Sequence, residues 1–277
     1  MATFGRGICI ITGASKGFGR ALAHEVSVLL GRRKKGGKER KAERKKNTCL
    51  VFLQVSHSLE PGSVLLLVAR SGTLLQDLKE ELHSFSEKQH LIVHCIAVDL
   101  STREGVNETV RIARQEAVNE IDHVLLINNA GSLGEISGFE NFTDLEMVNS
   151  YLSFNVSSAL ALTAGILQVF PCRTGLRWNV VNVSSIFALK ALPSWVLYCT
   201  AKAARKMMFS VLAEEEPNVK VLSYSPGPMD TEMQEDILRL TGTRHCLLPC
   251  QESAVKLVKL LHDNDFPSGK HLDFFEV

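Results

Sequence analysis

Short apolar segments alternate with longer helical segments along almost the whole chain, and this alternation limits the fold more than any other feature. The apolar runs are continuous, as expected for parallel strands that helices cover on both faces. The expected strands are Ile8–Thr12, Val64–Ala69, Ile92–Val98, Val124–Asn128, Asn179–Val183 and Val219–Ser225. The expected helices are Lys16–Leu30, Thr73–Glu87, Arg103–Glu120, Leu145–Val169, Ser194–Glu215 and Glu252–His262. The pattern predicts an α/β fold with one doubly wound parallel sheet of about seven strands and helices on both faces.

The composition is typical of one globular domain, residues 1–277. With 45% hydrophobic and 22% charged residues, the chain can bury a large core and is too apolar to be disordered. Its continuous apolar runs are too short to cross a bilayer, and Gly13 interrupts the N-terminus before a signal-like stretch forms. Seven cysteines without a CxxC pair indicate reduced thiols in the cytoplasm. His245, Cys246 and Cys250 lie close together, but we interpret them as part of a loop and expect no metal site.

One segment, residues 31–58, does not fit the alternation. Residues 32–46 contain ten lysines and arginines and two glutamates, a local charge of +8, while the rest of the chain carries −7. A charge confined to one run is typical of a solvated loop, although it also suits a nuclear-localisation or anionic-surface patch. We interpret 31–58 as a dispensable basic insertion. Its apolar part, Thr48–Val55, competes with Val64–Ala69 for the second strand, and we favour the latter because Pro61-Gly62 supplies a turn before it.

The first expected strand ends in a glycine-rich turn, and the second ends in an arginine. The turn consists of Gly13, Ala14, Ser15, Lys16, Gly17, Phe18 and Gly19 and opens a helix. Its glycines permit a tight bend and a close approach of the backbone to a pyrophosphate, which the helix N-terminus stabilises, as in Rossmann-type folds. After Ala69 stands Arg70, where a carboxylate would bind a ribose 2′-hydroxyl. Arg70 and Lys16 instead suit a 2′-phosphate, so the sequence predicts NADP(H) rather than NAD.

A second group of residues carries reactive side chains. Tyr198 and Lys202 are four residues apart in an expected helix, so both project from one face. A tyrosine becomes a useful acid when its pKa, about 10, is lowered, and a neighbouring ammonium does this by stabilising the phenolate. Ser185 follows the expected strand Asn179–Val183, at the edge where such sheets bind ligands, and its hydroxyl can hold a substrate carbonyl. A Tyr-x-x-x-Lys pair alone is usually a surface coincidence, and its place after this serine and the glycine turn makes it specific.

In order and spacing, these motifs resemble the short-chain dehydrogenase/reductase family. The matching strings are Thr12-Gly13-x-x-x-Gly17-x-Gly19, Asn128-Asn129-Ala130-Gly131, Ser185, Tyr198-x-x-x-Lys202 and Pro226-Gly227. The resemblance covers nearly the whole chain apart from residues 31–58. It implies an NADP(H)-dependent, cytoplasmic, homodimeric oxidoreductase that binds neither nucleic acid nor a membrane.

The resemblance also implies roles for individual residues. Tyr198 would donate a proton to the substrate carbonyl, Lys202 would lower the Tyr198 pKa and hold the nicotinamide ribose, and Ser185 would polarise the carbonyl. Asn155 matches the family asparagine that supports a proton-relay water; alternatively it bonds backbone groups at an irregular helical turn. For Asp99, a cofactor contact and capping of the next helix are the two alternatives. The expected cofactor contacts are the glycine turn, Ala69, Arg70, Asp99, Leu100, Asn128, Tyr198, Lys202, Met229, Asp230, Thr231, Glu232, Met233 and Gln234. The expected substrate contacts are Ser185, Tyr198, Gly227 and Asp273.

Longer strings narrow the expected substrate to a pterin. Residues 13–20, 126–134, 198–205, 215–219, 226–231 and 272–275 resemble members of the family that reduce pterin side-chain carbonyls in the last step of tetrahydrobiopterin synthesis. In those members, a carboxylate matching Asp273 anchors the pterin through its amino and ring N–H donors. Two departures remain, because 31–58 is extra and Gln234–Glu252 is shorter than the segment that covers the substrate.

Two other functions therefore stay open. The chain is alternatively a reductase of dicarbonyl or aromatic carbonyl compounds. A protein that binds NADPH without catalysis and acts through its basic run is the third interpretation, and the intact set of Ser185, Tyr198 and Lys202 argues against it.

Overall fold

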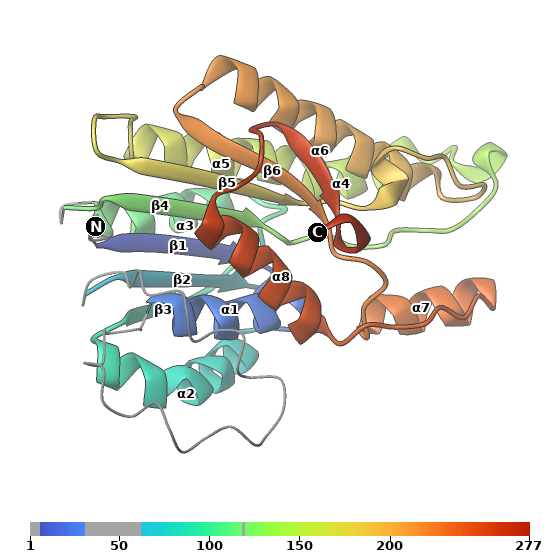
Figure 1. The fold of residues 1–277 in the computed structure, drawn as a ribbon. Coiled ribbons are helices and arrows are strands. Elements are labelled where there is room, and N and C mark those ends of the chain that lie inside the picture. The colour runs from blue at the N-terminus through green and yellow to red at the C-terminus, as the bar shows by residue number, and fades with distance from the viewer. Residues whose placement is uncertain (1–5, 31–61, 118–119) are drawn as a thin grey trace.

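The computed structural model describes residues 6–30, 62–117 and 120–277, which contain one seven-stranded sheet (Figure 1). The strands are β1 (Gly7–Thr12), β2 (Val64–Ala69), β3 (Ile92–Ala97), β4 (His123–Asn128), β5 (Arg177–Val183), β6 (Val219–Ser225) and β7 (Lys270–Asp273). Their order is β3-β2-β1-β4-β5-β6-β7, and every neighbouring pair is parallel. The predicted doubly wound parallel fold is confirmed. The predicted insertion 31–58 lies outside the described residues.

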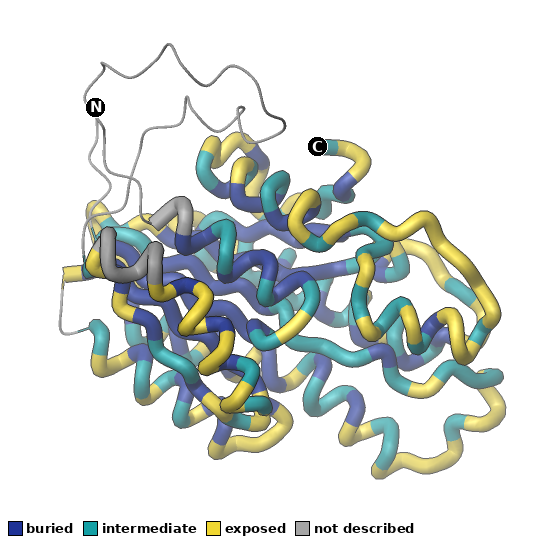
Figure 2. The backbone as a smooth tube through the Cα atoms, turned by 90° about the horizontal axis from the view of Figure 1, so that it is seen from below, coloured by how far each residue is buried: buried dark blue, intermediate teal, exposed yellow. Residues whose placement is uncertain are grey.

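Helices cover both faces of this sheet. They are α1 (Gly17–Leu30), α2 (Gly72–Gln89), α3 (Arg103–Glu116), α4 (Leu145–Leu152), α5 (Ser158–Val169), α6 (Val196–Glu215), α7 (Glu232–Thr241) and α8 (Cys250–Asp263). Helices α1, α2 and α8 pack on one face, while α3, α5 and α6 pack on the other. Strands β1 and β2 are consequently buried at every position. In Figure 2 the buried strands form the centre, and the exposed residues lie on the outer sides of the helices and in the loops.

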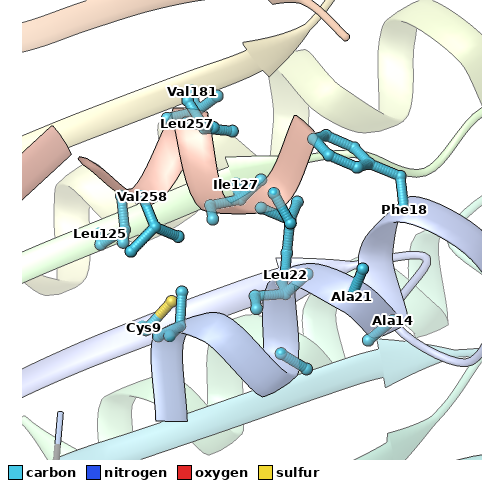
Figure 3. Close-up of a cluster of buried hydrophobic side chains, with 14 of the residues drawn as sticks. Cys9, Ala14, Phe18, Ala21, Leu22, Leu125, Ile127, Val181, Leu257 and Val258 are labelled. Atoms are coloured by element: carbon cyan, nitrogen blue, oxygen red, sulfur yellow. The ribbon is translucent and has the colours of Figure 1, made fainter. Parts of the chain in front are cut away.

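The packing of α1 against α8 fixes the start of α1 (Figure 3). Phe18 and Leu22 of α1 lie in one buried cluster with Leu257 and Val258 of α8. Burying a side chain of this size contributes roughly 1.5–3 kcal/mol. Ala14, in the turn before α1, is completely buried, and its N–H donates to the carbonyl oxygen of Val68 in β2 over 3.2 Å. The turn is therefore attached to the sheet on one side and to a packed helix on the other.

The predicted strands all form, with ends that differ by at most two residues. The expected helix Leu145–Val169 is divided, because a π-helical turn at Ser153–Ser157 separates α4 from α5. Neither α7 nor the position of β7 was predicted from the sequence. Both are short and rich in charged residues, and Ile237 is the only residue of α7 that is buried.

Residues Leu145–Val169 together have the length and mean hydropathy of a membrane-crossing helix, which the sequence analysis had not expected of any segment. The inner side of α5 nevertheless packs on the sheet through Ala159, Leu162 and Ile166, all of which are buried. Leu160 on the outer side is 53% exposed. The segment is a sheet-covering helix with an apolar outer face.

Candidate active site

The carboxyl ends of the strands meet at one edge of the sheet, and most of the predicted site residues lie there (Figure 1). At this edge Asn128 of β4 pairs with Asn182 of β5, and Ser225 of β6 pairs with Asp273 of β7. The parallel pairing thus brings together residues that are far apart in the sequence.

The glycine turn at the end of β1 has no room for larger residues. Gly13 has a φ of +65°, in the left-handed region that favours glycine. A Cβ on Gly19 would collide with the carbonyl oxygen of Gly13. The Asn129 amide donates to the carbonyl oxygens of Thr12 and Gly13 over 2.9 and 3.2 Å, and Thr12 Oγ1 accepts the N–H groups of Asn129 and Ala130. The turn formed by Gly13 and Gly19 has no space for a Cβ at Gly19 and leads into the N-terminus of α1. Such a turn fits the pyrophosphate of a dinucleotide.

The predicted 2′-phosphate contacts lie on either side of this turn. Arg70 follows β2 and is exposed. Lys16 is also exposed, but its Nζ lies 2.6 Å from Glu232 Oε1, at the start of α7. Lys16 therefore forms an ion pair with Glu232, which was also predicted to contact the cofactor.

Asp99 and Leu100 follow β3 at the same edge. Asp99 Oδ1 accepts the Ser101 N–H over 2.8 Å; hydrogen bonds from Ser101, and to a smaller degree the charge of Arg70, lower the pKa of Asp99. Thr102, not Asp99, caps α3, because Thr102 Oγ1 accepts the Gly105 N–H over 3.0 Å. The capping alternative for Asp99 is therefore wrong.

Tyr198, Lys202 and Ser185 come together where α6 passes the end of β5. Lys202 Nζ donates to the carbonyl oxygen of Val183 over 2.9 Å and lies 5.5 Å from the centroid of the Tyr198 ring. The Ser185 side chain lies close enough to the Tyr198 hydroxyl to lower its pKa. Ser185 also caps the short 3₁₀ turn Ile186–Ala188 by accepting the Phe187 N–H over 3.2 Å.

The electrostatics of this group differ from the sequence prediction. Burial raises the pKa of Tyr198, and the opposing influences are the hydrogen bond with Ser185 and the positive charge of Arg205. Burial, assisted by Arg205, lowers the pKa of Lys202 to about 7. The role of Lys202 in lowering the Tyr198 pKa stays a prediction, and Ser185 and Arg205 lower this pKa as well.

Arg205 is the residue that the sequence reasoning missed. Its side chain is 1% exposed, and its guanidinium donates to Asn182 Oδ1 and to the carbonyl oxygens of Ala130 and Asn128. The available signal was its spacing: Tyr198, Lys202 and Arg205 follow one another at i, i+4 and i+7 and so share one face of α6.

The two predicted asparagines make other contacts than expected. Asn155, 4% exposed, lies in the π-helical turn, where its Oδ1 accepts the Ser132 N–H and its Nδ2 donates to Ser132 Oγ and to the Tyr151 carbonyl oxygen. Bonding at an irregular turn, the alternative for Asn155, is thus what its side chain does. The Asn128 side chain donates to Thr163 Oγ1 on α5, away from the glycine turn, and Asn129 contacts that turn instead.

Apolar side chains surround the Tyr198 ring. The ring makes edge-on contacts with Trp195 and Phe187, at centroid distances of 5.6 and 6.5 Å. Their cluster also contains Leu133 from the segment after β4, and Met233 and Ile237 from α7. Met233, a predicted cofactor contact, therefore belongs to the wall around the tyrosine, and α7 closes the site from outside.

The predicted pterin contacts lie at the end of β7. One oxygen of Asp273 accepts the Phe275 N–H over 3.1 Å, and the Asp273 N–H donates to Glu276 in a capping box. Gly227, with a φ of +77°, lies beside this turn: a Cβ there would be in ordinary contact with Phe274 and Phe275, at 3.7 and 3.6 Å, and 3.0 Å from Leu248 Cδ1. Asp273 is therefore a half-buried helix cap at the catalytic edge rather than a solvated charge.

The other predicted cofactor residues, Met229, Asp230, Thr231 and Gln234, belong to the segment that leads from β6 into α7. Met229 forms an isolated bridge with Leu248, and the Asp230 N–H donates to the Leu248 carbonyl oxygen over 2.9 Å. Thr231 precedes the first turn of α7. The segment thus borders the glycine turn, as the Lys16–Glu232 pair shows.

Comparisons with known proteins agree with this geometry. The family described as short chain dehydrogenase matches residues 52–240. The sepiapterin reductase of Xenopus laevis is 44% identical to the chain over 283 residues, covering 97% of this chain and 95% of the relative. The sepiapterin reductase of Rattus norvegicus is 41% identical and covers 99% and 98%. Among solved structures, a short chain dehydrogenase of Shigella flexneri 2a in complex with NADP shares the fold, with a TM-score of 0.71, 20% identity and coverage of 98% and 97%.

Proposed function

The chain belongs to the short-chain dehydrogenase/reductase family and is a homologue of its sepiapterin reductases, and on this basis we propose that it reduces the side-chain carbonyls of pterins with NADPH. The candidate substrates are sepiapterin and 6-pyruvoyl-tetrahydropterin. The observation that carries the proposal is the meeting of Tyr198, Ser185 and Lys202 at the end of β5, with Asp273 at the same sheet edge.

Several residues support NADPH as the cofactor. The glycine turn and the N-terminus of α1 would hold the pyrophosphate, and Arg70 with Lys16 would hold the 2′-phosphate. A carboxylate in the place of Arg70 would favour NADH by binding the ribose hydroxyl, and none stands there. When bound, the cofactor supplies the hydride for the carbonyl carbon.

The chain's own residues supply the proton and the orientation. The Tyr198 hydroxyl donates its proton to the carbonyl oxygen, while the Ser185 hydroxyl binds the same oxygen and withdraws charge from it. Lys202, which Val183 holds in place, would bind the nicotinamide ribose. The aromatic side chains of Trp195 and Phe187 keep water from the tyrosine and strengthen these interactions.

Asp273 supports a pterin rather than a simple carbonyl compound as substrate. Its carboxylate is an acceptor at the catalytic edge, and the amino group and ring N–H of a pterin are donors. Its capping of the last 3₁₀ turn fixes its orientation. The exposed segment between α7 and α8, which we expect to be shorter than in other pterin-reducing members, reaches the neighbourhood of Gly227 through Leu248.

The outer faces of α5 and α6 support a homodimer. Helices α5 and α6 cover the same face of the sheet. On their outer sides, Leu160 of α5 is 53% exposed, and Met207 and Val211 of α6 are 62% and 45% exposed. An exposed apolar patch is typical of an association site, and we propose that these residues contribute to one. Light scattering of the purified chain would then give twice its mass of 30.6 kDa.

We place this dimer in the cytoplasm as one domain per chain, because the six described cysteines are free thiols and a single sheet organises the described residues.

The test is NADPH oxidation by the purified full chain with sepiapterin, diacetyl and an aromatic carbonyl compound as separate substrates. We expect turnover with all three and the highest kcat/KM with sepiapterin. Turnover with diacetyl but not sepiapterin would favour the general carbonyl reductase, and NADPH binding without any turnover would favour the non-catalytic protein.

A further inference from the structure

Arg205 is a buried cation in a place where a helix facing a sheet normally carries apolar residues. It lies on α6 two turns after Tyr198, and its side chain is among the largest in the structure that are fully buried. Burying an arginine costs free energy unless all its polar groups are paired. Because this free-energy cost arises beside Tyr198, we ask what Arg205 contributes to the reaction as well as to packing.

The guanidinium joins two strand ends to the helix. Its Nε donates to Asn182 Oδ1 over 2.8 Å, its Nη1 to the Ala130 carbonyl oxygen over 2.9 Å, and its Nη2 to the Asn128 carbonyl oxygen. Asn182 belongs to β5, while Asn128 and Ala130 end β4 and begin the following segment. Arg205 therefore fixes α6 to the strand ends that precede Ser185 and the loop containing Ser132.

All three acceptors are uncharged, so the positive charge of Arg205 is not cancelled locally. Within the described part of the chain, Arg205 forms no ion pair. The ionisable groups that act on it are the hydroxyls of Tyr198 on α6 and Tyr151 on α4, and it acts in turn on Lys202. Burial lowers the pKa of Arg205 to about 10, so the group remains a cation at neutral pH. Burial and the charge of Arg205 lower the pKa of Lys202 to about 7, so Lys202 loses its proton at a lower pH than Arg205 does.

We propose that Arg205 is a positioning residue for the carbonyl reduction, because it fastens the helix that carries Tyr198 and Lys202 to the ends of β4 and β5 and supplies the lasting positive charge behind both side chains. This inference rests on the proposed function. It adds Arg205 to Lys202 as a source of positive charge beside Tyr198.

If Arg205 acts through its charge, its removal changes the pKa values of Tyr198 and Lys202, which a packing role alone would not do. Its removal raises the pKa of Tyr198, because the phenolate loses a stabilising charge, and also raises the pKa of Lys202, because the ammonium loses a repelling one. Both titrations then move to higher pH. A purely structural role would lower stability and kcat without moving either midpoint.

Three substitutions separate charge from shape. Arg205→Met removes the charge and the hydrogen bonds, while Arg205→Lys keeps the charge and loses part of the bonding. Asn182→Asp keeps an acceptor for Arg205 in the same place and adds a negative charge that cancels the field. The matched control is Lys206→Met, which removes a charge one residue further along α6, on another side of the helix.

The first measurement needs no turnover. The chain has only three tyrosines, so phenolate absorbance during alkaline titration is resolvable, and the spectrum of Tyr198→Phe identifies the contribution of Tyr198. Burial raises the pKa of all three tyrosines, so the difference from Tyr198→Phe is what assigns the Tyr198 titration. We expect Asn182→Asp and Arg205→Met to move the Tyr198 midpoint up by about one pH unit. Arg205→Lys and Lys206→Met should leave it within the error of the wild type.

The second measurement is the pH dependence of kcat with NADPH and sepiapterin, together with the melting temperature of each variant. Arg205→Met should lose roughly tenfold to hundredfold in kcat, with a smaller change in the KM for NADPH. The midpoint near pH 7 should move upward in Asn182→Asp, and Arg205→Lys should recover part of the rate. If Asn182→Asp melts as the wild type does and neither midpoint moves, the proposal is wrong. Lack of sepiapterin turnover in the wild type would overturn the proposed function alone, because the phenolate titration is independent of substrate.

Discussion

The two walls of the sheet edge are built in different ways. The inner wall is formed by the glycine turn, Asn129 and the α6 residues Tyr198, Lys202 and Arg205. Asn129, Lys202 and Arg205 donate hydrogen bonds to groups at the ends of β1 and β5. The outer wall consists of residues 227–241 with the C-terminal turn 273–277, and its helix buries few side chains. Helix α7 buries only Ile237 and lies beyond the strand ends (Figure 1).

This difference separates reaction from selectivity. A group that transfers a proton has to stay within a fraction of an ångström of its place, and the inner wall provides this rigidity through buried contacts. Segments with few buried contacts open at a lower free energy and can admit and release ligands. We therefore expect substitutions in the inner wall to affect every substrate, and those in the outer wall to affect particular ligands.

The largest effect is expected for the inner wall's proton donor. Tyr198→Phe removes the hydroxyl and should lower kcat by ~10²–10⁴-fold for every carbonyl substrate, with little change in NADPH affinity. Tyr224→Phe is the matched control, because the Tyr224 hydroxyl bonds Ser253 within the core. Steady-state kinetics and NADPH fluorescence titration measure the two quantities. Retention of most of the turnover would show that the proton comes from elsewhere.

The glycine turn gives the next effect. Gly19→Ala forces a Cβ against the Gly13 carbonyl oxygen, and overpacking of this kind typically costs about 1–3 kcal/mol. Affinity for NADPH should fall roughly tenfold to hundredfold, and affinity for NADH equally, because both share the pyrophosphate. In Gly175→Ala, where nothing lies within 4 Å of the new Cβ and the φ of +88° strains only the local turn, cofactor affinity should not change. Equal losses in the two variants would contradict the steric argument.

Arg70 tests the choice of cofactor. Arg70→Ala should weaken NADPH binding by about tenfold, the value of a hydrogen bond to a charged group, and leave NADH binding nearly unchanged. Isothermal titration with both cofactors gives the comparison within one variant. A parallel loss for NADH would mean that Arg70 does not reach the 2′-phosphate.

The smallest effect is expected where the walls touch. Glu232→Gln releases Lys16 from an exposed ion pair and should tighten NADPH binding about two- to fivefold at low salt, with no change at high salt. Asp236→Asn breaks a similar exposed pair with Arg239 on the same helix and serves as the control. Weaker NADPH binding in Glu232→Gln would show that this carboxylate helps to hold the cofactor.

Much of the inner wall could be predicted from the sequence because its signals are local. Continuous apolar runs gave the buried strands, and the four-residue spacing of Tyr198 and Lys202 placed both on one face of α6. The end of β2 at Arg70 followed from the same pattern. These elements are buried on both sides, so pattern and structure agree.

The rest depends on contacts between distant residues. An arginine in a helical sequence is usually a surface residue, and the acceptors that bury Arg205 come from two strands far away in the chain. Asn128 and Asn129 are neighbours in the sequence, and only contacts with distant residues show that Asn129 faces the glycine turn while Asn128 bonds Thr163. Helix α7 and strand β7 carry charged residues because they lie at the rim, where no apolar run is required.

The most direct test of the two-wall account is the ratio of kcat/KM for sepiapterin to kcat/KM for diacetyl in the wild type, Tyr198→Phe and Asp273→Asn. Asparagine retains the helix cap at position 273 and removes only the charge. The account predicts that Tyr198→Phe lowers both values and leaves the ratio unchanged, whereas Asp273→Asn lowers the ratio about tenfold and keeps diacetyl turnover. An unchanged ratio in Asp273→Asn, or a changed one in Tyr198→Phe, would contradict the division between a reactive wall and a selective wall.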